Sequence, residues 1–125
     1  MKIVLLSLLV LATAAKASAA AHRPDVGTAS WYGEAHRGRL MANGKKFNPD
    51  KLTAASWFYP LGTKVRVTLK SSQRRSRSVL VKITDRGPAY DLVRDGRAID
   101  LSEAAFRQLA SPDVGLVPVK IEPLH

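Results

Sequence analysis

Four stretches of the chain either alternate apolar and polar residues or are short runs rich in β-branched and aromatic residues. They are residues 28–32, 63–69, 78–84 and 116–122. Because successive side chains of a strand point to opposite faces, this pattern predicts half-buried β-strands. Within the last stretch Pro118 has no N–H to donate, so we expect it at a sheet edge or a bulge.

One stretch, residues 103–109, has a convincing helical pattern. Its apolar face carries positions 101, 104, 105 and 109. Ser102 is a suitable N-cap, and Glu103 places negative charge at the positive end of the helix. The patterns together indicate a mainly β domain with one or two short helices. Several short strands in about a hundred residues favour a small closed barrel, because closure leaves no strand edge exposed.

Residues 1–19 have the features of a secretory signal peptide. A basic start precedes the apolar run 3–15, and Ala-Ser-Ala at 17–19 forms a small-x-small cleavage site, with Ala21 as a second register. The run is shorter than the about 20 residues that a membrane span needs, and Lys16 interrupts it. We therefore expect a cleaved signal rather than an uncleaved anchor. The protein would then be exported, periplasmic or secreted, with no transmembrane anchor after processing.

Composition limits the remaining chain. Residues 20–26 look like a flexible lead-in, and a chain of 125 residues allows one domain. It has no cysteine, which excludes a disulfide scaffold, a thiolate nucleophile and a lipid-anchored cysteine. Its three histidines make a metal site improbable, and we expect no cofactor. The formal charge of +10 favours an acidic partner, and export directs it to anionic envelope polymers rather than nucleic acid.

Two aspartates are candidates for acid–base chemistry. Asp85 ends the strand 78–84 and opens an Asp-Arg-Gly-Pro turn, and Asp100 lies between two apolar residues just before the helix. Burial raises the pKa of a carboxyl and keeps it protonated for general-acid work. The alternative is structural. Asp85 accepts hydrogen bonds from its own turn or pairs with Arg86 or Arg97, and Asp100 pairs with Arg97 or helps to cap the helix. If both act in catalysis, they should converge in one open cleft.

Aromatic side chains cluster at Trp31-Tyr32 and Trp57-Phe58. Exposed aromatic faces stack on sugar rings, which suits a glycan groove, whereas core packing is the favoured interpretation for Trp31. A Ser-His-Asp triad lacks its sequence context, so His36 is interpreted as a surface or ligand-contact residue.

Several blocks of the chain closely resemble the rare lipoprotein A family, in the family's order. They are Gly27-Thr-Ala-Ser-Trp-Tyr-Gly33, Gly38-Arg39, Ala42-Asn-Gly44, Leu52-Thr-Ala-Ala55, Pro60-Leu-Gly-Thr63, Val65-Arg-Val67, Thr84-Asp-Arg-Gly-Pro88 and Arg97-Ala-Ile-Asp-Leu-Ser102. The resemblance covers residues 27–122 and implies a six-stranded double-psi β-barrel. It also implies an endolytic lytic transglycosylase that cleaves the MurNAc–GlcNAc β-1,4 bond of peptide-poor peptidoglycan strands and leaves 1,6-anhydroMurNAc ends.

The resemblance also assigns roles to individual residues. Asp100 would be the acid and base, and Asp85 would orient or tune it. The sugar groove would be lined by Trp31, Tyr32, His36, Asn43 and Arg86. No metal ion is implied, and a monomer is expected.

Three positions depart from the family pattern. Where the family reads Glu, Asp and His, this chain has Lys45, Asn48 and Ser56. Lys45 is no proton-donating acid in the ordinary range, and Asn48 and Ser56 do not titrate. A second hypothesis therefore stands beside the enzyme: a catalytically silent, expansin-like barrel that binds cell-wall glycan.

Overall fold

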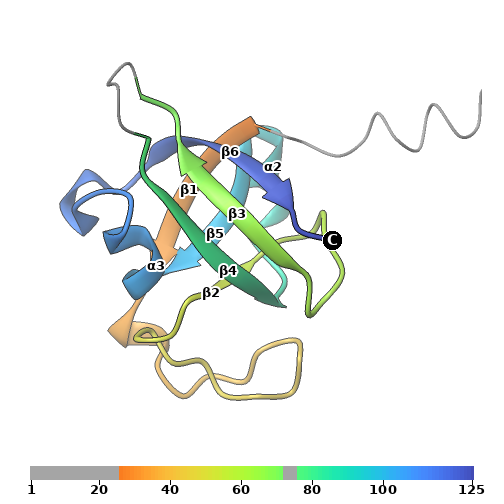
Figure 1. The fold of residues 1–125 in the computed structure, drawn as a ribbon. Helices are drawn as coiled ribbons and strands as arrows, with labels where there is room; N and C mark the ends of the chain where they lie inside the picture. Colours follow the sequence, from red (N-terminus) through yellow and green to blue (C-terminus); the bar gives the residue numbers. More distant parts are fainter. Residues whose placement is uncertain (1–25, 72–75) are drawn as a thin grey trace, which may run out of the picture.

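The computed structural model describes residues 26–71 and 76–125, so the signal peptide expected at 1–19 and nearly all of the expected lead-in lie outside the described residues. The elements along the chain (Figure 1) are β1 (Val26–Tyr32), η1 (Glu34–His36), β2 (Thr53–Ala55), β3 (Lys64–Leu69), β4 (Ser78–Asp85), α2 (Tyr90–Arg94), β5 (Arg97–Ser102), α3 (Glu103–Arg107), η2 (Pro112–Val114) and β6 (Val117–Pro123). None of the helices in these two ranges is long and apolar enough to cross a membrane.

The strands close into a barrel in the order β1-β5-β2-β4-β3-β6. The pairs β1–β5 and β2–β4 are parallel, and the other four pairs are antiparallel. The closed, mainly β barrel predicted from the sequence is therefore confirmed. The two parallel pairs place the carboxyl end of β1 beside that of β5, and the carboxyl end of β2 beside that of β4. Residues that are far apart in the sequence therefore lie together at these strand ends.

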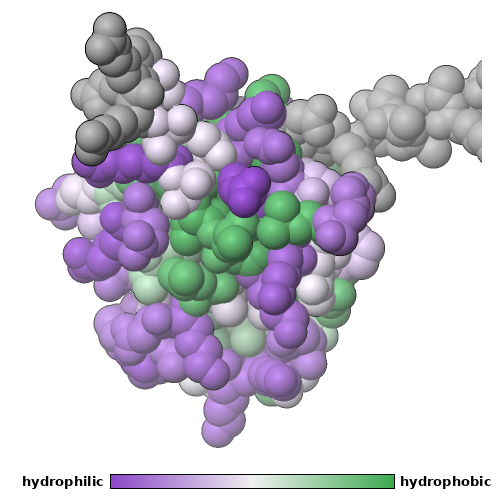
Figure 2. All heavy atoms as spheres, in the orientation of Figure 1, coloured by the Kyte–Doolittle hydropathy of each residue, from purple (hydrophilic) through white to green (hydrophobic). Residues whose placement is uncertain are grey.

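The barrel interior is filled by the apolar positions of the alternating strands. In β4, Val79, Val81 and Ile83 are buried while the residues between them are exposed. The helix α3 begins where the sequence predicts, because the Ser102 hydroxyl accepts a hydrogen bond from the Ala105 N–H. Phe106 of that helix is fully buried in the same core. Figure 2 shows the polar surface outside this core and an apolar patch over β3 and β4.

Pro118 lies neither at a sheet edge nor at a bulge, since β6 is paired on both sides. Its carbonyl accepts a 2.9 Å hydrogen bond from the N–H of Lys70, just beyond the last residue of β3. The N–H and C=O of one strand residue face the same neighbour. An N–H at residue 118 would therefore point toward the end of the β3–β6 ladder. Its absence there leaves the other hydrogen bonds between β3 and β6 intact.

Two strands and one helix have no counterpart in the sequence prediction. The strand β2 is only three residues long, and α2 is a single short helix after the Asp-Arg-Gly-Pro turn. The strand β5 covers the segment that looked like the approach to α3. Asp100 is therefore a strand residue, paired with Ser30 of β1 on one side and Ala55 of β2 on the other.

Candidate functional site

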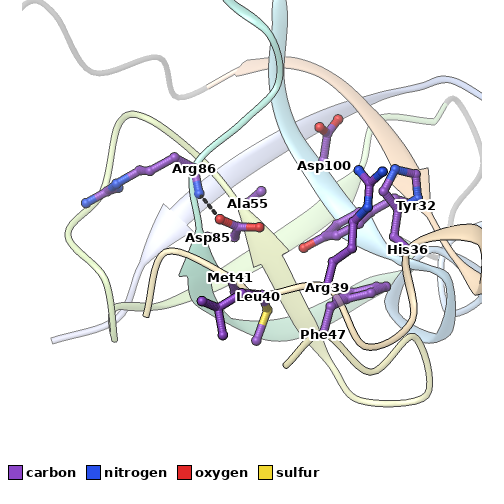
Figure 3. Close-up of a pocket in the computed structure, with 10 residues that line it drawn as sticks. All are labelled: Tyr32, His36, Arg39, Leu40, Met41, Phe47, Ala55, Asp85, Arg86 and Asp100. Atoms are coloured by element: carbon purple, nitrogen blue, oxygen red, sulfur yellow. Dashed lines mark hydrogen bonds between the residues drawn. The ribbon is translucent and has the colours of Figure 1, made fainter. Parts of the chain in front are cut away.

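A cavity of about 270 Å³ opens where the long loop between β1 and β2 meets the barrel (Figure 3). Four strands contribute one residue each to its wall, five residues come from the loop, and Arg86 comes from the turn after β4. The lining residues are Tyr32, His36, Arg39, Leu40, Met41, Phe47, Ala55, Asp85, Arg86 and Asp100. Asp85 and Asp100 thus line one open cavity, as the sequence led us to expect. We call it the acid cavity.

Asp100 has the environment of a carboxyl that holds its proton. Burial raises its pKa, and a hydrogen bond donated by the Ser30 hydroxyl lowers it in part. The positive charges of Arg97 and His36 also lower the pKa, whereas the nearby charge of Asp85 raises it. The net pKa lies above that of an ordinary aspartate. Asp100 therefore keeps its proton to a higher pH than an exposed aspartate does, which favours a role as proton donor.

Gly87 keeps the second oxygen of this carboxyl clear. A Cβ at residue 87 would lie 3.2 Å from Asp100 Oδ2 and 3.3 Å from the Ala55 Cβ. Both distances are tighter than ordinary van der Waals contact, so a side chain there would displace the carboxyl or the strand. The glycine of the Asp-Arg-Gly-Pro turn is thus explained by its close approach to Asp100.

Asp85 is held by backbone donors. Its Oδ1 accepts hydrogen bonds from the N–H of Ala42 at 2.9 Å and of Arg86 at 2.8 Å, and its own carbonyl accepts from the Ser56 N–H at 3.0 Å. The carboxylate therefore fastens the loop to the turn after β4, and the carbonyl of the same residue holds the segment after β2. The bond to Arg86 is the turn contact that the structural alternative anticipated, and the bond to Ala42 adds control of the loop.

Arg86 lines the acid cavity, but its guanidinium is hydrogen-bonded to backbone carbonyls rather than to the two carboxyl groups. Nη1 donates to the carbonyl oxygens of Ser56 at 2.9 Å and Tyr59 at 2.6 Å, and Figure 3 shows the side chain extending away from both carboxyl groups. The sequence placed Arg86 among the sugar contacts, and the structure instead gives its side chain a role in holding the 56–59 segment. Ser56 is itself fully buried, and its hydroxyl accepts from the Phe58 N–H.

Tyr32 and His36 bring unpartnered polar atoms to the acid cavity. The Tyr32 ring stacks on Phe47 with centroids 4.2 Å apart, and its edge meets His36 at 5.8 Å. The Tyr32 hydroxyl and His36 Nδ1 are buried without a hydrogen-bond partner. Burial, with the charges of Asp85 and Asp100, raises the pKa of Tyr32 above that of an ordinary phenol. The phenol therefore remains a hydrogen-bond donor that a bound ligand could satisfy.

The remaining predicted groove residues lie elsewhere. Trp31 packs against the core, with its ring 6.4 Å from that of Phe106 and its Nε1 donating to the Pro112 carbonyl at 2.9 Å. Core packing, the favoured interpretation, is confirmed, and Trp31 is not among the acid cavity's lining residues. Asn43 lines a second cavity of about 220 Å³, which adjoins the first through Met41. Lys45 and Asn48 line this second cavity too.

Sequence reasoning missed the contribution of the loop to the acid cavity. Arg39, Leu40, Met41 and Phe47 all reach it from a segment without alternating or helical periodicity. The acid cavity combines an acid of raised pKa, a second carboxylate, a phenol and an imidazole, which is a set suited to general acid–base chemistry. Across residues 26–71 and 76–125, no three histidine, aspartate or glutamate side chains gather closely enough to hold a metal ion.

Comparisons with known proteins agree with the fold. The Streptomyces papain inhibitor superposes with a TM-score of 0.54 at 25% identity, covering 77% of this chain and 91% of that one. An expansin mutant of Clavibacter michiganensis in complex with cellohexaose superposes with a TM-score of 0.58 at 20% identity, covering 81% of this chain and 50% of that one. Both neighbours are double-psi barrels, which confirms the predicted six-stranded double-psi β-barrel.

Sequence comparisons are more specific. The profile of a family described as "Lytic transglycolase" matches residues 25–121. The probable endolytic peptidoglycan transglycosylase RlpA of a Nostoc species is 47% identical over 100 residues, which cover 78% of this chain and 25% of that protein. The corresponding RlpA of Pseudomonas aeruginosa is 42% identical over 97 residues, covering 78% and 26%.

A Synechocystis protein named uncharacterized protein ssl3177 is 43% identical over 94 residues, which cover 75% of this chain and 92% of that one. The chain thus spans about a quarter of the length of the Nostoc and Pseudomonas transglycosylases, and nearly all of this short relative. The profile, the relatives and the barrel agree, and the chain belongs to the RlpA-like lytic transglycolase family, with the double-psi barrel domain of that family.

Proposed function

We propose that this protein is a lytic transglycosylase that cleaves the MurNAc–GlcNAc β-1,4 bond of peptide-poor peptidoglycan strands. The names of the RlpA relatives support the reaction class and the polymer. The observation that carries the proposal is the position of Asp100, a carboxyl of raised pKa that lines an open cavity beside a second carboxylate.

In the proposed reaction a single carboxyl does two jobs in turn. Protonated Asp100 donates its proton to the glycosidic oxygen as the bond from that oxygen to C1 of MurNAc breaks. The resulting carboxylate then takes the proton of the MurNAc C6 hydroxyl while the C6 oxygen bonds to C1. A 1,6-anhydro ring closes, a free GlcNAc hydroxyl leaves, and no water is consumed. Asp100 ends protonated and ready for the next cycle.

The other residues of the acid cavity support this step. Asp85 keeps the loop in place through Ala42, and its charge contributes to the raised pKa of Asp100. The unpartnered Tyr32 hydroxyl and His36 Nδ1 are the groups proposed to bond sugar hydroxyl or acetamide groups. Apolar side chains of Met41 and Phe47 offer surface for the faces of the sugar rings.

A second candidate function is a glycan-binding barrel without cleavage. It is favoured by Lys45, Asn48 and Ser56, which stand where the family pattern has Glu, Asp and His. Ser56 is fully buried and hydrogen-bonded within its own turn, so it takes no part in the acid cavity. The expansin neighbour, whose structure contains cellohexaose, is a fold relative for such a barrel.

Export is part of the proposal, because peptidoglycan lies outside the cytoplasm. We propose that residues 1–19 are a signal peptide removed at Ala19 or Ala21, which leaves the barrel in the periplasm or the medium. The sequence pattern supports this. Edman sequencing of protein recovered from the envelope fraction should begin at residue 20 or 22, and a sequence beginning at Met1 would contradict export by cleavage.

One assay separates cleavage from binding. The protein is incubated with amidase-treated, peptide-free glycan strands, and the products are analysed by mass spectrometry for 1,6-anhydroMurNAc ends. The proposal expects such ends with the wild type and with Asp113→Asn, an exposed control, and none with Asp100→Asn. Retention of wild-type protein on the strands without products would overturn the enzyme and support the glycan-binding barrel.

A further inference from the structure

The second cavity has a strongly one-sided charge. Four lysines line its mouth, and its remaining lining residues are uncharged, so it contains no carboxylate. Its lining residues are Met41, Asn43, Lys45, Lys46, Asn48, Lys51, Thr53, Lys82 and Thr84. We call it the basic cavity. Within residues 26–71 and 76–125, the ion pairs that form involve none of these four lysines.

The fold itself gathers these groups. Thr53 of β2 pairs with Lys82 of β4, and Thr84 follows two residues later on the same strand. Residues two apart on a strand point to one side, so Lys82 and Thr84 leave the barrel together while Ile83 enters the core. The loop from residue 41 to residue 51 then adds three lysines opposite them.

The floor of the basic cavity holds two unsatisfied hydroxyl groups. Thr53 Oγ1 and Thr84 Oγ1 are buried without a hydrogen-bond partner, and Thr84 is only 5% exposed. Buried polar groups in native proteins are nearly always hydrogen-bonded, so a pair of unsatisfied hydroxyls at one cavity marks a place where a bound group completes them. Hydroxyl donors beneath ammonium groups suit an anion that accepts several hydrogen bonds.

We propose that the basic cavity binds a carboxylate on the glycan strand, namely the lactyl carboxylate of a muramic acid unit that carries no stem peptide. The choice of a glycan strand as the ligand rests on the proposed function, because the same polymer would then occupy both adjoining cavities. A stem peptide converts this carboxylate into a neutral amide and so removes the group that the cavity would bind. Where the family pattern has Glu and Asp, this cavity has Lys45 and Asn48, so one acidic position has become basic and another neutral.

The test compares two forms of one polymer. Fluorescently labelled, amidase-treated strands are used either with free lactyl carboxylates or after conversion of these to methylamides. All proteins carry Asp100→Asn so that no strand is cut, and binding is followed by fluorescence anisotropy. We expect the carboxylate form to bind roughly tenfold more tightly than the methylamide form. Equal binding of the two forms would overturn the proposal.

Matched variants locate the effect. Lys51→Gln with Lys82→Gln should abolish the preference for the carboxylate form while leaving methylamide strands bound as before. Lys70→Gln with Lys120→Gln removes the same charge from exposed positions outside the cavity and should retain the preference. If the first pair retained the preference, Lys51 and Lys82 would not recognise the carboxylate; if both pairs lost it equally, only overall charge would act. Either result would overturn the site. Circular dichroism melting checks that each pair is folded.

Two further arms separate this inference from its alternatives and from the proposed function. Inorganic polyphosphate of matched charge should compete more weakly than the carboxylate strands, and equal competition would contradict recognition of a carboxylate. Cleavage is scored separately with an intact Asp100. A protein that prefers carboxylate strands but releases no anhydro ends would keep the basic cavity and lose only the enzyme.

Discussion

The acid cavity and the basic cavity adjoin at Met41 and draw on the same strands, yet they are built differently. Asp85 and Asp100 are half-buried, and their carboxylate oxygens accept hydrogen bonds from Ala42, Arg86 and Ser30. The lysines of the basic cavity are exposed and stand mainly on the loop. Groups fixed by hydrogen bonds suit a reaction that needs one geometry, whereas exposed charges without ion pairs suit selection of a charged substrate. Under the two proposals, the barrel strands would carry the chemistry and the loop lysines would select the glycan substrate.

The largest effect should separate the two cavities by kinetics. Asp100→Asn should lower kcat by about 10²–10⁴-fold, because a positioned general acid contributes that much. Lys51→Gln with Lys82→Gln should instead raise KM on carboxylate strands by roughly tenfold with little change in kcat. Steady-state release of anhydro ends measures both. A fall in kcat for the lysine pair as large as for Asp100→Asn would break the division of roles.

The next prediction tests whether Arg86 contacts the glycan or only stabilises the fold. Arg86→Met should destabilise the fold by about 2 kcal/mol, because the Ser56 and Tyr59 carbonyls lose a charged donor. Glycan affinity of the folded variant should stay close to that of the wild type. Urea denaturation and the anisotropy assay give the two readings. Weakened glycan binding at unchanged stability would restore Arg86 as a sugar contact.

Asp85→Asn should move the pH profile rather than abolish activity. The amide oxygen can still accept from Ala42 and Arg86, but the negative charge that raises the pKa of Asp100 is gone. The pKa of Asp100 should fall, so the upper limb of the kcat profile should shift to lower pH. A limb that stays in place or moves upward would show that the charge of Asp85 does not reach Asp100.

The smallest effect concerns Tyr32. Tyr32→Phe removes a buried hydroxyl that has no partner, so the free energy of unfolding should stay the same or rise by up to about 1 kcal/mol. Affinity for strands should fall severalfold, since a sugar loses that donor. Thermal unfolding and anisotropy report the two quantities. A destabilised variant with unaltered affinity would place the hydroxyl in the fold rather than in binding.

Much of the barrel was predictable from local pattern. The strands β3, β4 and β6 have strong signals because they alternate and bury one face, β1 was recognised as a short β-prone run, and Ser102 satisfies a helix end. The strand β2 is too short to show a period, and β5 buries apolar residues on both faces, so alternation is lost. The convergence of Asp85 and Asp100 on one cavity was expected from the resemblance to the family rather than from the local pattern.

The rest of the site depends on pairings that no local pattern encodes. The parallel pairing of β2 with β4 brings Thr53 beside Lys82, and the loop then covers both. The direction of the Arg86 side chain is set by two carbonyl groups about thirty residues earlier in the chain. Neither the basic cavity nor the hydrogen bonds of Arg86 to the 56–59 segment could be predicted from composition, because both join residues that are far apart in the sequence.

The central claim of the proposed cleavage is that burial raises the pKa of Asp100, so that its carboxyl keeps its proton to a higher pH than an ordinary aspartate does. It is tested directly by ¹³C NMR titration of the Asp100 side-chain carboxyl in selectively labelled protein. The account expects a midpoint above about 3.9, the value of an unperturbed aspartate, and a lower midpoint in Asp85→Asn. A wild-type midpoint at or below that value would contradict the general-acid role of Asp100.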